Sequence, residues 1–389
     1  MNILEQLMIN QPVINIGTLG SVSEGKSTLV KKLSGIVTQC HSREKIRNIT
    51  IKQGYGNMKI FETPEGVLTT QEDDSENKLV NHISWVDCPG HMDRIQTALG
   101  SISLMDGVIL IIGVKDKLEM KPQLIQHLLG IKMAGIKRLI VCLNKIDLVS
   151  KDVLLEYKKE VDALFDKYGI KPNYIIPTSF NKGIGLNWIL NAIQELFNPT
   201  LWLEKTKDTP ILKISRSFDI NKPGMDWSDI KGGVIGGTIT SGQFKVGDVI
   251  EIKPGRINKR TGVAIPIKTI IKSIQTGSTN LDVGYAGGLV AIGTDIDPFE
   301  TKNDGLVGNI CGVVNTLPET VSEISFNIEW IDKPAKLDNL CLLIGTRMCK
   351  AILDNTTFKL EKPMCILDKE QIIVCQDING TIKVIGVKQ

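Results

Sequence analysis

Short apolar runs alternate with amphipathic stretches over the first half of the chain. The clearest apolar runs are residues 13–16, 83–86, 108–112 and 139–143. Such short, strongly apolar runs are typical of buried strands in a parallel sheet, which are apolar on both faces. Apolar residues at helical spacing occur in residues 92–104, 122–133, 153–168 and 185–197. This alternation predicts a doubly wound α/β sheet, which binds its ligands where the strands end.

The pattern changes after residue 205. The later strand-like runs are β-branched and punctuated by glycine, and they include residues 232–240, 248–252, 287–292 and 381–387. Such runs are typical of antiparallel barrels. A second break in the pattern lies at residues 315–319. We therefore expect an α/β domain in residues 1–205, a first β-barrel domain in residues 206–314 and a second in residues 315–389.

Composition narrows the class of protein. The 389 residues are 42% hydrophobic and 23% charged, with a formal net charge of +3. These values are typical of an ordinary globular protein with modest non-specific affinity for nucleic acid. No apolar run is long enough to span a bilayer, no signal peptide is indicated, and the eight cysteines form no CxxC pair. We expect a cytoplasmic protein that does not bind membranes.

The strongest chemical signal is a glycine-rich segment after the first apolar run. Residues 20–27 read GSVSEGKS, which fits the phosphate-loop spacing GxxxxGK[ST], and a helical pattern starts near Lys26. The glycines let backbone N–H groups converge on phosphate oxygens, Lys26 reaches the outer phosphates, and the Ser27 hydroxyl is placed to bind Mg2+. The predicted phosphate-binding residues are Gly20, Ser23, Glu24, Gly25, Lys26, Ser27 and Thr28.

A second motif selects the base. Asn144, Lys145 and Asp147 follow the apolar run 139–143 as a loop follows a buried strand. The Asp147 carboxylate can accept hydrogen bonds from the ring N–H and the exocyclic amine of guanine, whereas adenine offers neither donor. Asn144 would support the edge of the base, and Lys145 would pack its stem over the ring. The sequence therefore predicts a guanine nucleotide.

A third motif completes the site. Asp87 and Gly90 end the strand pattern 83–86, where Asp87 would hold Mg2+ and the Gly90 N–H would touch the terminal phosphate. Upstream, Thr50 could complete the Mg2+ shell when the third phosphate is present. We expect both segments to be switches that relax after hydrolysis. His91 is the candidate that orients the attacking water.

The remaining histidines are His41, His82 and His127. None has a partner at the spacing of a metal site, so we interpret all three as structural residues.

Together these residues resemble translational GTPases, and within them the gamma subunits of archaeal and eukaryotic translation initiation factor 2. The resemblance rests on residues 15–18, 47–55 and 86–93, and it continues in residues 216–224, 231–234 and 293–298. The most specific string is RSFDINKPG at 216–224, because elongation factors share the GTPase motifs but lack this string. The resemblance covers nearly the whole chain.

The resemblance implies a GTPase domain followed by two barrels that bind GTP or GDP with Mg2+. It implies initiator methionyl-tRNA as a partner, with its methionyl group near Tyr55 and Asn57, and delivery of that tRNA to the small ribosomal subunit. It also implies alpha and beta subunits, a GTPase-activating protein and a nucleotide-exchange factor. Intrinsic hydrolysis is expected to be slow without the activator.

Several residues depart from the family pattern. Ser21 and Glu24 stand where relatives usually carry histidines, and we expect the Glu24 side chain to point to solvent, away from the phosphates. The second guanine loop reads Thr178-Ser179-Phe180, from which Ser179 and Phe180 would contact the base. Residues 61–81 contain no cysteine, so zinc is not predicted. This acidic stretch is interpreted as a hairpin extension or a disordered loop.

Two other interpretations remain open at the level of sequence. One is an elongation-type carrier of another aminoacyl-tRNA, including a selenocysteine-specific factor, against which the RSFDINKPG string argues. The other is a scaffold subunit in which Glu24 has weakened nucleotide binding.

Overall fold

The computed structural model describes residues 3–38, 54–72, 76–91, 94–118, 121–258 and 260–389. The chain divides into two compact units. The first comprises Met1–Leu201 with Gly380–Val384, and the second comprises Trp202–Asn379 with Ile385–Gln389. The boundaries expected at residues 205 and 314 stay predictions.

The first unit is built on a seven-stranded sheet with the order β3-β2-β4-β1-β5-β6-β7. Its strands are β1 (Ile14–Leu19), β2 (Gly54–Glu62), β3 (Leu68–Thr69), β4 (Lys78–Asp87), β5 (Gly107–Gly113), β6 (Leu139–Asn144) and β7 (Tyr174–Pro177). The five strands from β4 to β7 in this order are parallel, and β2 and β3 add an antiparallel hairpin. The described part of the acidic stretch therefore forms a hairpin extension.

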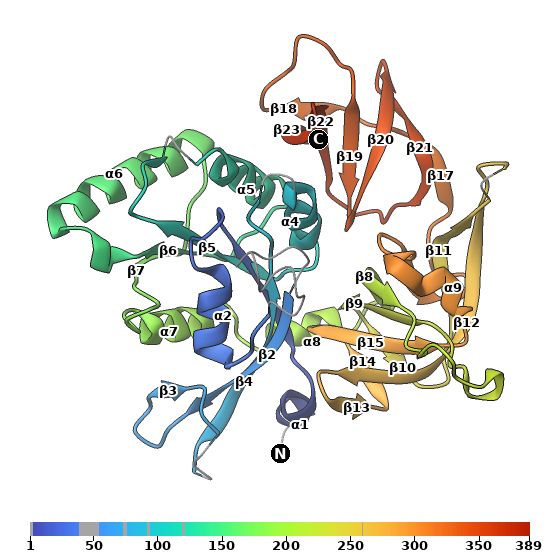
Figure 1. The fold of residues 1–389 in the computed structure, drawn as a ribbon, viewed down its shortest axis with the longest axis horizontal. Helices are drawn as coiled ribbons and strands as arrows, with labels where there is room; N and C mark the ends of the chain where they lie inside the picture. The colour runs from blue at the N-terminus through green and yellow to red at the C-terminus, as the bar shows by residue number, and fades with distance from the viewer. Residues whose placement is uncertain (1–2, 39–53, 73–75, 92–93, 119–120, 259) are drawn as a thin grey trace. The chain divides into compact units, whose positions relative to one another are not determined.

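Helices cover both faces of this sheet (Figure 1). They are α1 (Ile3–Asn10), α2 (Lys26–Ser34), α4 (Ile95–Ile102), α5 (Pro122–Met133), α6 (Lys151–Tyr168) and α7 (Leu186–Leu196). α6 shows how the sequence sets such boundaries. It begins after Ser150, whose side chain accepts from the Val153 N–H, and it ends at Gly169 in the left-handed region.

The parallel strands place their polar ends at one edge of the sheet. β1, β5 and β6 are buried along their whole length, which explains why β5 and most of β6 are continuously apolar. β1 also buries the polar Asn15 and Thr18, whose side chains donate to the Leu104 carbonyl oxygen and to Asp87. In the register of the sheet, Thr18 pairs with Asp87, and Gly113 pairs with Asn144. The phosphate loop, Asp87 and Asn144 therefore all follow strands at the same edge.

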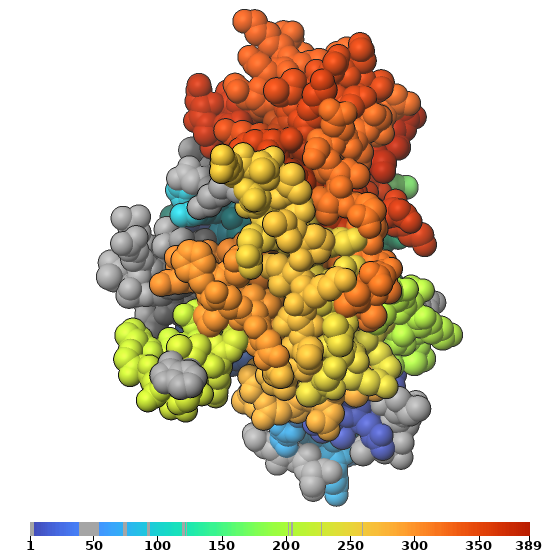
Figure 2. All heavy atoms as spheres, turned by 90° about the vertical axis from the view of Figure 1, so that its right-hand side faces the viewer, coloured from blue at the N-terminus to red at the C-terminus, as the bar shows by residue number. Residues whose placement is uncertain are grey.

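The second unit begins within α8 (Leu201–Lys205). An antiparallel barrel follows, which is closed because β11 pairs with both β16 and β12. The barrel strands are β8 (Ile211–Phe218), β9 (Val234–Ser241), β11 (Val249–Ile257), β12 (Ala264–Thr276), β15 (Leu289–Thr294) and β16 (Ile310–Val313). Smaller elements are β10 (Gln243–Lys245), β13 (Thr279–Leu281), β14 (Val283–Tyr285), α9 (Pro298–Thr301) and the 3-10 turns η4 (Trp227–Asp229) and η5 (Lys302–Asp304). The yellow and light orange atoms in the middle of Figure 2 belong to this barrel.

A curled antiparallel sheet follows, with the order β17-β21-β20-β19-β22-β23-β18. Its strands are β17 (Thr320–Ser325), β18 (Ile328–Trp330), β19 (Leu340–Ile344), β20 (Arg347–Asp354), β21 (Thr357–Cys365), β22 (Ile372–Ile378) and β23 (Thr381–Lys388). Phe326 and Phe358 stack in its core. The α/β sheet followed by two antiparallel β structures confirms the predicted fold class. Across the described ranges, no helix combines the length and apolar content that a membrane span requires.

Two buried histidines make the stability of the first unit depend on pH. Burial lowers the pKa of His82 to about 4 and that of His127 to about 3. Below pH 6.5 the unfolded chain therefore binds protons that the folded unit excludes, and the free energy of unfolding falls. Each histidine contributes up to about 1.4 kcal/mol per pH unit. Stability is thus full above pH 6.5 and declines as the pH falls toward 4.

Guanidinium unfolding between pH 7.5 and 5 measures this slope. His127→Gln should reduce the slope by up to half, whereas substitution of the exposed His91 by glutamine should leave it unchanged. Equal slopes in all three proteins would contradict the assignment to buried histidines.

Candidate functional site

The phosphate loop connects β1 to α2, and its backbone has two positions that favour glycine. Gly20 and Gly25 have φ angles of 143° and 112°, in a region that side chains disfavour. A Cβ on Gly20 would also overlap the Ile111 carbonyl oxygen. α2 begins at Lys26, directly after Gly25, so its free N–H groups and its positive dipole end lie at the loop. Thr28 is the third residue of this helix.

Lys26 lies inside the loop. Its Nζ donates to the carbonyl oxygens of Gly20 at 2.9 Å and Ser21 at 2.7 Å, and the residue is only 6% exposed. Burial lowers the pKa of Lys26, and Asp87 is the strongest of the anionic groups that oppose this effect. Gly90 lies against the same group, since a Cβ there would overlap Lys26 Nζ. The structure therefore brings the ammonium and the predicted phosphate-contacting glycine together.

Asp87 is a fully buried carboxylate that accepts three hydroxyl hydrogen bonds. Thr18 Oγ1 donates to Oδ1 at 2.9 Å, while Ser27 Oγ and Thr38 Oγ1 each donate to Oδ2 at 2.6 Å. Carboxylate and hydroxyl oxygens are the hard ligands that Mg2+ prefers. Ser27 and Asp87 therefore fit the predicted magnesium site. Thr50, the third predicted ligand, lies outside the described residues.

The base-recognition loop is tied to the phosphate loop by one amide side chain. Asn144 Nδ2 donates to the Glu24 carbonyl oxygen at 2.8 Å, and Asn144 Oδ1 accepts from the Phe180 N–H at 3.2 Å. Lys145 has a φ of 70°, and the 3-10 turn η3 (Ile146–Leu148) follows it. Asp147 lies in this turn with its side chain exposed. The loop therefore leaves the predicted guanine-recognition carboxylate open to a ligand.

The second predicted base loop packs beneath the first. Phe180 is 1% exposed, and a Cβ on Gly25 would lie 3.1 Å from its ring. Ser179 is equally buried, and the Ile146 N–H donates to the Thr178 carbonyl oxygen at 3.2 Å. Any contact with a base from Phe180 would therefore come from its backbone, because its ring fills the core.

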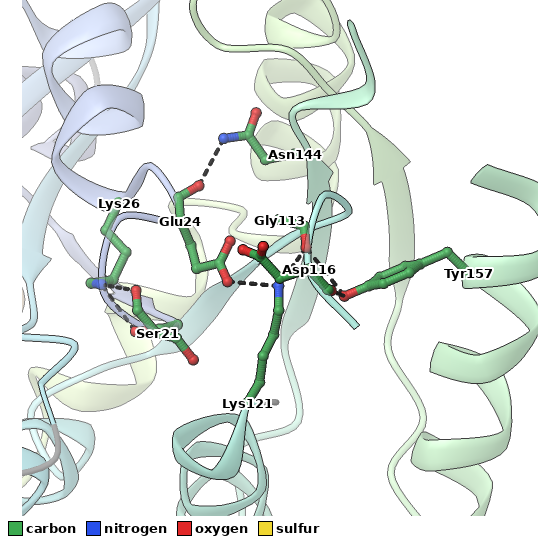
Figure 3. A network of polar contacts seen from close by, with 9 residues as sticks. Ser21, Glu24, Lys26, Gly113, Asp116, Lys121, Asn144 and Tyr157 are labelled. Carbon is green, nitrogen blue, oxygen red and sulfur yellow. Dashed lines mark hydrogen bonds and ion pairs between the residues drawn. The ribbon is translucent and has the colours of Figure 1, made fainter. Parts of the chain in front are cut away.

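The Glu24 side chain does not point to solvent, so the expectation for it is wrong. The residue is 4% exposed, and its Oε1 accepts from Lys121 Nζ at 2.7 Å (Figure 3). Lys121 also donates to the Gly113 carbonyl oxygen at the end of β5. A buried carboxylate is stable only when it is paired. The partner here comes from a segment about a hundred residues away, which no local pattern revealed.

The other predicted site residues lie on the described part of the same sheet and its loops. His91 follows Gly90 and its side chain is exposed. Tyr55 and Asn57 lie on β2, opposite Val86 and Ser84 of β4, and are half-buried. Because they are two residues apart on a strand, both side chains face the same side of the sheet.

Sequence reasoning missed Thr38, Lys121 and Tyr157. Thr38 shares Asp87 Oδ2 with Ser27, and Tyr157 Oη donates to the carbonyl oxygens of Gly113 and Asp116 at 3.1 Å each. The acidic residue in the phosphate loop was a signal that some cation must lie nearby. Nothing in the sequence indicated which of the many lysines it is.

Comparison with known proteins agrees with this geometry. Residues 11–199 match the model of the elongation factor Tu GTP binding domain. The chain is 36% identical to translation initiation factor 2 subunit gamma of Methanococcus maripaludis over 405 aligned residues, covering 97% of this chain and 98% of the relative. The proteins of the same name from Methanosarcina mazei and Methanocaldococcus jannaschii are 39% and 35% identical, again over 97% of this chain.

Solved structures agree on the fold. A bacterial selenocysteine-specific elongation factor superposes with a TM-score of 0.75 at 21% identity, over 97% of this chain and 58% of that protein. Translation elongation factor SelB from Methanococcus maripaludis, in complex with a GTP analogue, gives a TM-score of 0.73 at 20% identity, over 97% of this chain and 79% of that protein. At such low identity the likeness concerns the fold alone.

Proposed function

This chain belongs to the family of translation initiation factor 2 gamma subunits, and we propose on that basis that it binds initiator methionyl-tRNA in its GTP state. It would deliver this tRNA to the small ribosomal subunit and release it after GTP hydrolysis. The observation that carries the proposal is the identity of 36% over 97% of the chain and 98% of the relative. An elongation-type carrier is the alternative that the experiment below separates.

The arrangement at the sheet edge supports a cycle of GTP binding and hydrolysis. The loop amides, Lys26 and Gly90 would hold the phosphates, and Asn144, Lys145 and Asp147 would hold guanine. Ser27 and Asp87 would hold Mg2+, which when bound neutralises phosphate charge. The buried pairing of Glu24 with Lys121 argues against a scaffold with weakened nucleotide binding, because the carboxylate is compensated within the protein.

His91 is the residue that we propose for orienting the attacking water. It directly follows Gly90, which lies against Lys26, and its side chain is exposed. An imidazole nitrogen there can accept a hydrogen bond from water aimed at the terminal phosphate. The activating protein implied by the family would supply further charge stabilisation, so hydrolysis by the isolated chain is expected to be slow.

We expect His91→Ala to slow GTP hydrolysis by about 10²–10³-fold with GTP affinity changed less than twofold, as is typical when one general acid–base group is removed. Single-turnover hydrolysis and nucleotide titration separate the two quantities. His91→Gln is the matched variant and should retain more activity, because an amide can also orient water. Wild-type hydrolysis by His91→Ala would remove His91 from the catalytic role.

A pocket in the first barrel is the candidate site for the end of the tRNA. Its volume is about 470 Å³, and it is lined by parts of three segments that carry the family resemblance. The lining residues from these segments are Phe218, Ile220, Lys231, Gly232, Val234, Gly293, Thr294 and Asp295. Lys272 of β12 also lines it and pairs with Asp295 at 2.9 Å. Apolar side chains beside two lysines suit a nucleoside with its phosphate.

The proposal is tested by retention of tRNA in the presence of GTP. The protein is loaded with GTP or GDP and incubated separately with initiator methionyl-tRNA, elongator methionyl-tRNA or uncharged initiator tRNA. The protein is then captured, and the tRNA that it retains is measured. Preference for the charged initiator in the GTP state is the expected result. Equal retention of both methionyl-tRNAs would favour the elongation-type alternative, and no GTP dependence would overturn the proposed cycle.

In the same assay, Lys272→Ala is expected to weaken initiator methionyl-tRNA binding about three- to tenfold, as loss of one phosphate contact does. Lys268→Ala is the matched control, because Lys268 is an exposed lysine of the same strand that does not line the pocket. Equal effects of the two substitutions would exclude a specific role for the pocket.

As a member of this family, the chain also has tRNA and other factor subunits as partners. We propose that these subunits are an alpha and a beta chain, and that an exchange factor renews GTP.

A further inference from the structure

The phosphate loop of this chain contains a buried carboxylate that one distant lysine neutralises. Glu24 and Lys121 are each 5% exposed at their side chains, and Glu24 Oε1 lies 2.7 Å from Lys121 Nζ. In Figure 3 the Glu24 side chain points toward Gly113 and Lys121, and Lys26 points toward Ser21 on the opposite side of the loop. The loop therefore carries cations on both sides, and only Lys26 belongs to its motif.

Lys121 is held in place by groups around the end of β5. Its Nζ donates to the Gly113 carbonyl oxygen and lies 5.9 Å from the centre of the Tyr157 ring. Tyr157 in turn donates to the same Gly113 oxygen at 3.1 Å. These contacts fix the ammonium where it meets Glu24, immediately before α5 begins at Pro122.

Compensation of Glu24 depends on Lys121. The second carboxylate oxygen, Oε2, is buried and has no hydrogen-bond partner in the part of the chain that the structure describes. Gly113 leaves room for it, because a Cβ on Gly113 would overlap Oε2. Removal of Lys121 would therefore leave a buried negative charge within the loop that must bind phosphates, where low polarity strengthens repulsion.

We propose that Lys121 is a positioning residue of the nucleotide site, which holds Glu24 away from the phosphates and cancels its charge. The affinity of this chain for guanine nucleotides then depends on a lysine outside every nucleotide-binding motif. The loss of affinity on removal of Lys121 increases with the number of phosphates in the nucleotide, because each added phosphate brings more negative charge near Glu24. This inference rests on the proposed nucleotide site, which binding of GTP by the wild-type chain tests separately.

The two single substitutions should differ, because only loss of the cation should weaken GTP binding by more than twofold. Lys121→Met leaves Glu24 unpaired, so GTP affinity should fall about tenfold, GDP affinity about threefold and GMP affinity less than twofold. Glu24→Gln leaves the cation in place, so GTP affinity should stay within twofold of wild type or increase. The double substitution Glu24→Gln/Lys121→Met should return GTP affinity to within threefold of wild type. Displacement of a fluorescent GDP analogue by each nucleotide measures all three affinities.

A merely structural salt bridge predicts a different outcome. It would give equal losses for GMP, GDP and GTP, or would weaken GTP binding in both single variants, and either result would overturn the proposal. Lys121→Arg keeps the charge and should bind GTP within threefold of wild type. If Lys121→Met does not fold, Lys121→Gln takes its place, because an amide can keep the hydrogen bond to Gly113 while removing the charge. It should give the same order of losses for GTP, GDP and GMP, and equal losses would overturn the proposal. Wild-type protein that fails to bind GTP would instead refute the nucleotide site itself.

Discussion

Substitution of Asp147 by asparagine should lower GTP affinity by about 10³–10⁴-fold and raise affinity for xanthosine triphosphate. The carboxylate lies exposed in the turn after β6, where it can accept from two donors of guanine. An amide presents a donor in place of one acceptor, so one guanine donor is left unpaired. Sites that hydrogen-bond a polar group of their ligand discriminate against an analogue without that group by roughly 10⁴-fold. Xanthine carries an oxygen where guanine has its amine, and the amide N–H suits that oxygen.

Competition between the two triphosphates for a fluorescent GDP analogue measures this exchange of preference. Asp152→Asn is a suitable control, because Asp152 is an exposed aspartate at the start of α6, five residues further along the chain. The control should bind both nucleotides as the wild-type chain does. Unchanged selectivity in Asp147→Asn would show that guanine is recognised elsewhere.

The sequence was sufficient to predict the elements that carry the site. The apolar runs at residues 108–112 and 139–143 became β5 and β6, both buried throughout, because strands covered on two faces are mostly apolar. The helix expected at residues 122–133 begins and ends at Pro122 and Met133. Proline is favoured at the first helical position, because its fixed φ suits the helix and its missing N–H has no partner there.

The same periodic signals explain why the polar motifs converge. Each motif directly follows a predicted strand, and parallel strands end at one edge of a sheet. The observed register places Thr18 beside Asp87 and Gly113 beside Asn144. Convergence of the phosphate loop, the Asp87 carboxylate and the loop after β6 was therefore predictable without knowledge of any side-chain contact.

Side-chain direction and long-range pairing were not predictable in this way. Glu24 was expected in solvent because repulsion from phosphate was the only interaction visible along the sequence. The structure shows a competing interaction, because Lys121 Nζ lies 2.7 Å from the Glu24 carboxylate. Thr38 was missed for a similar reason. Its hydroxyl resembles any other in a loop until the fold places it 2.6 Å from Asp87.

The contacts of Asn144 also link parts of the site that the motifs treat separately. One amide group joins the Glu24 carbonyl oxygen of the phosphate loop to the Phe180 N–H of the second base loop. A Cβ on Gly25 would lie 2.5 Å from Asn144 Nδ2, so the loop and the amide are in close contact. If guanine and phosphate bind as proposed, both would therefore rest on the same small set of contacts, which favours cooperation between the two halves of the nucleotide.

Substitution of Lys26 by methionine should lower the affinity for GTP by about 10³-fold, as truncation of one partner in a buried charge pair typically costs 2–5 kcal/mol. The Lys26 ammonium donates to the carbonyl oxygens of Gly20 and Ser21. Phosphate oxygens can replace these neutral acceptors with charged ones, so Lys26 gains most when the nucleotide binds. Methionine has a similar length and no charge, so the substitution removes the ammonium and keeps most of the volume of the side chain.

Isothermal titration with GTP and GDP measures the loss, and circular dichroism verifies that the variant remains folded. Lys32→Met is the matched control, because Lys32 lies on the same helix with an exposed side chain. It should bind both nucleotides as the wild-type chain does, because its charge is outside the loop and largely screened by solvent. GTP affinity within threefold of wild type in Lys26→Met would mean that the phosphates do not enter the loop. The proposed magnesium and base sites would then also be wrong, because both were placed relative to phosphates in this loop.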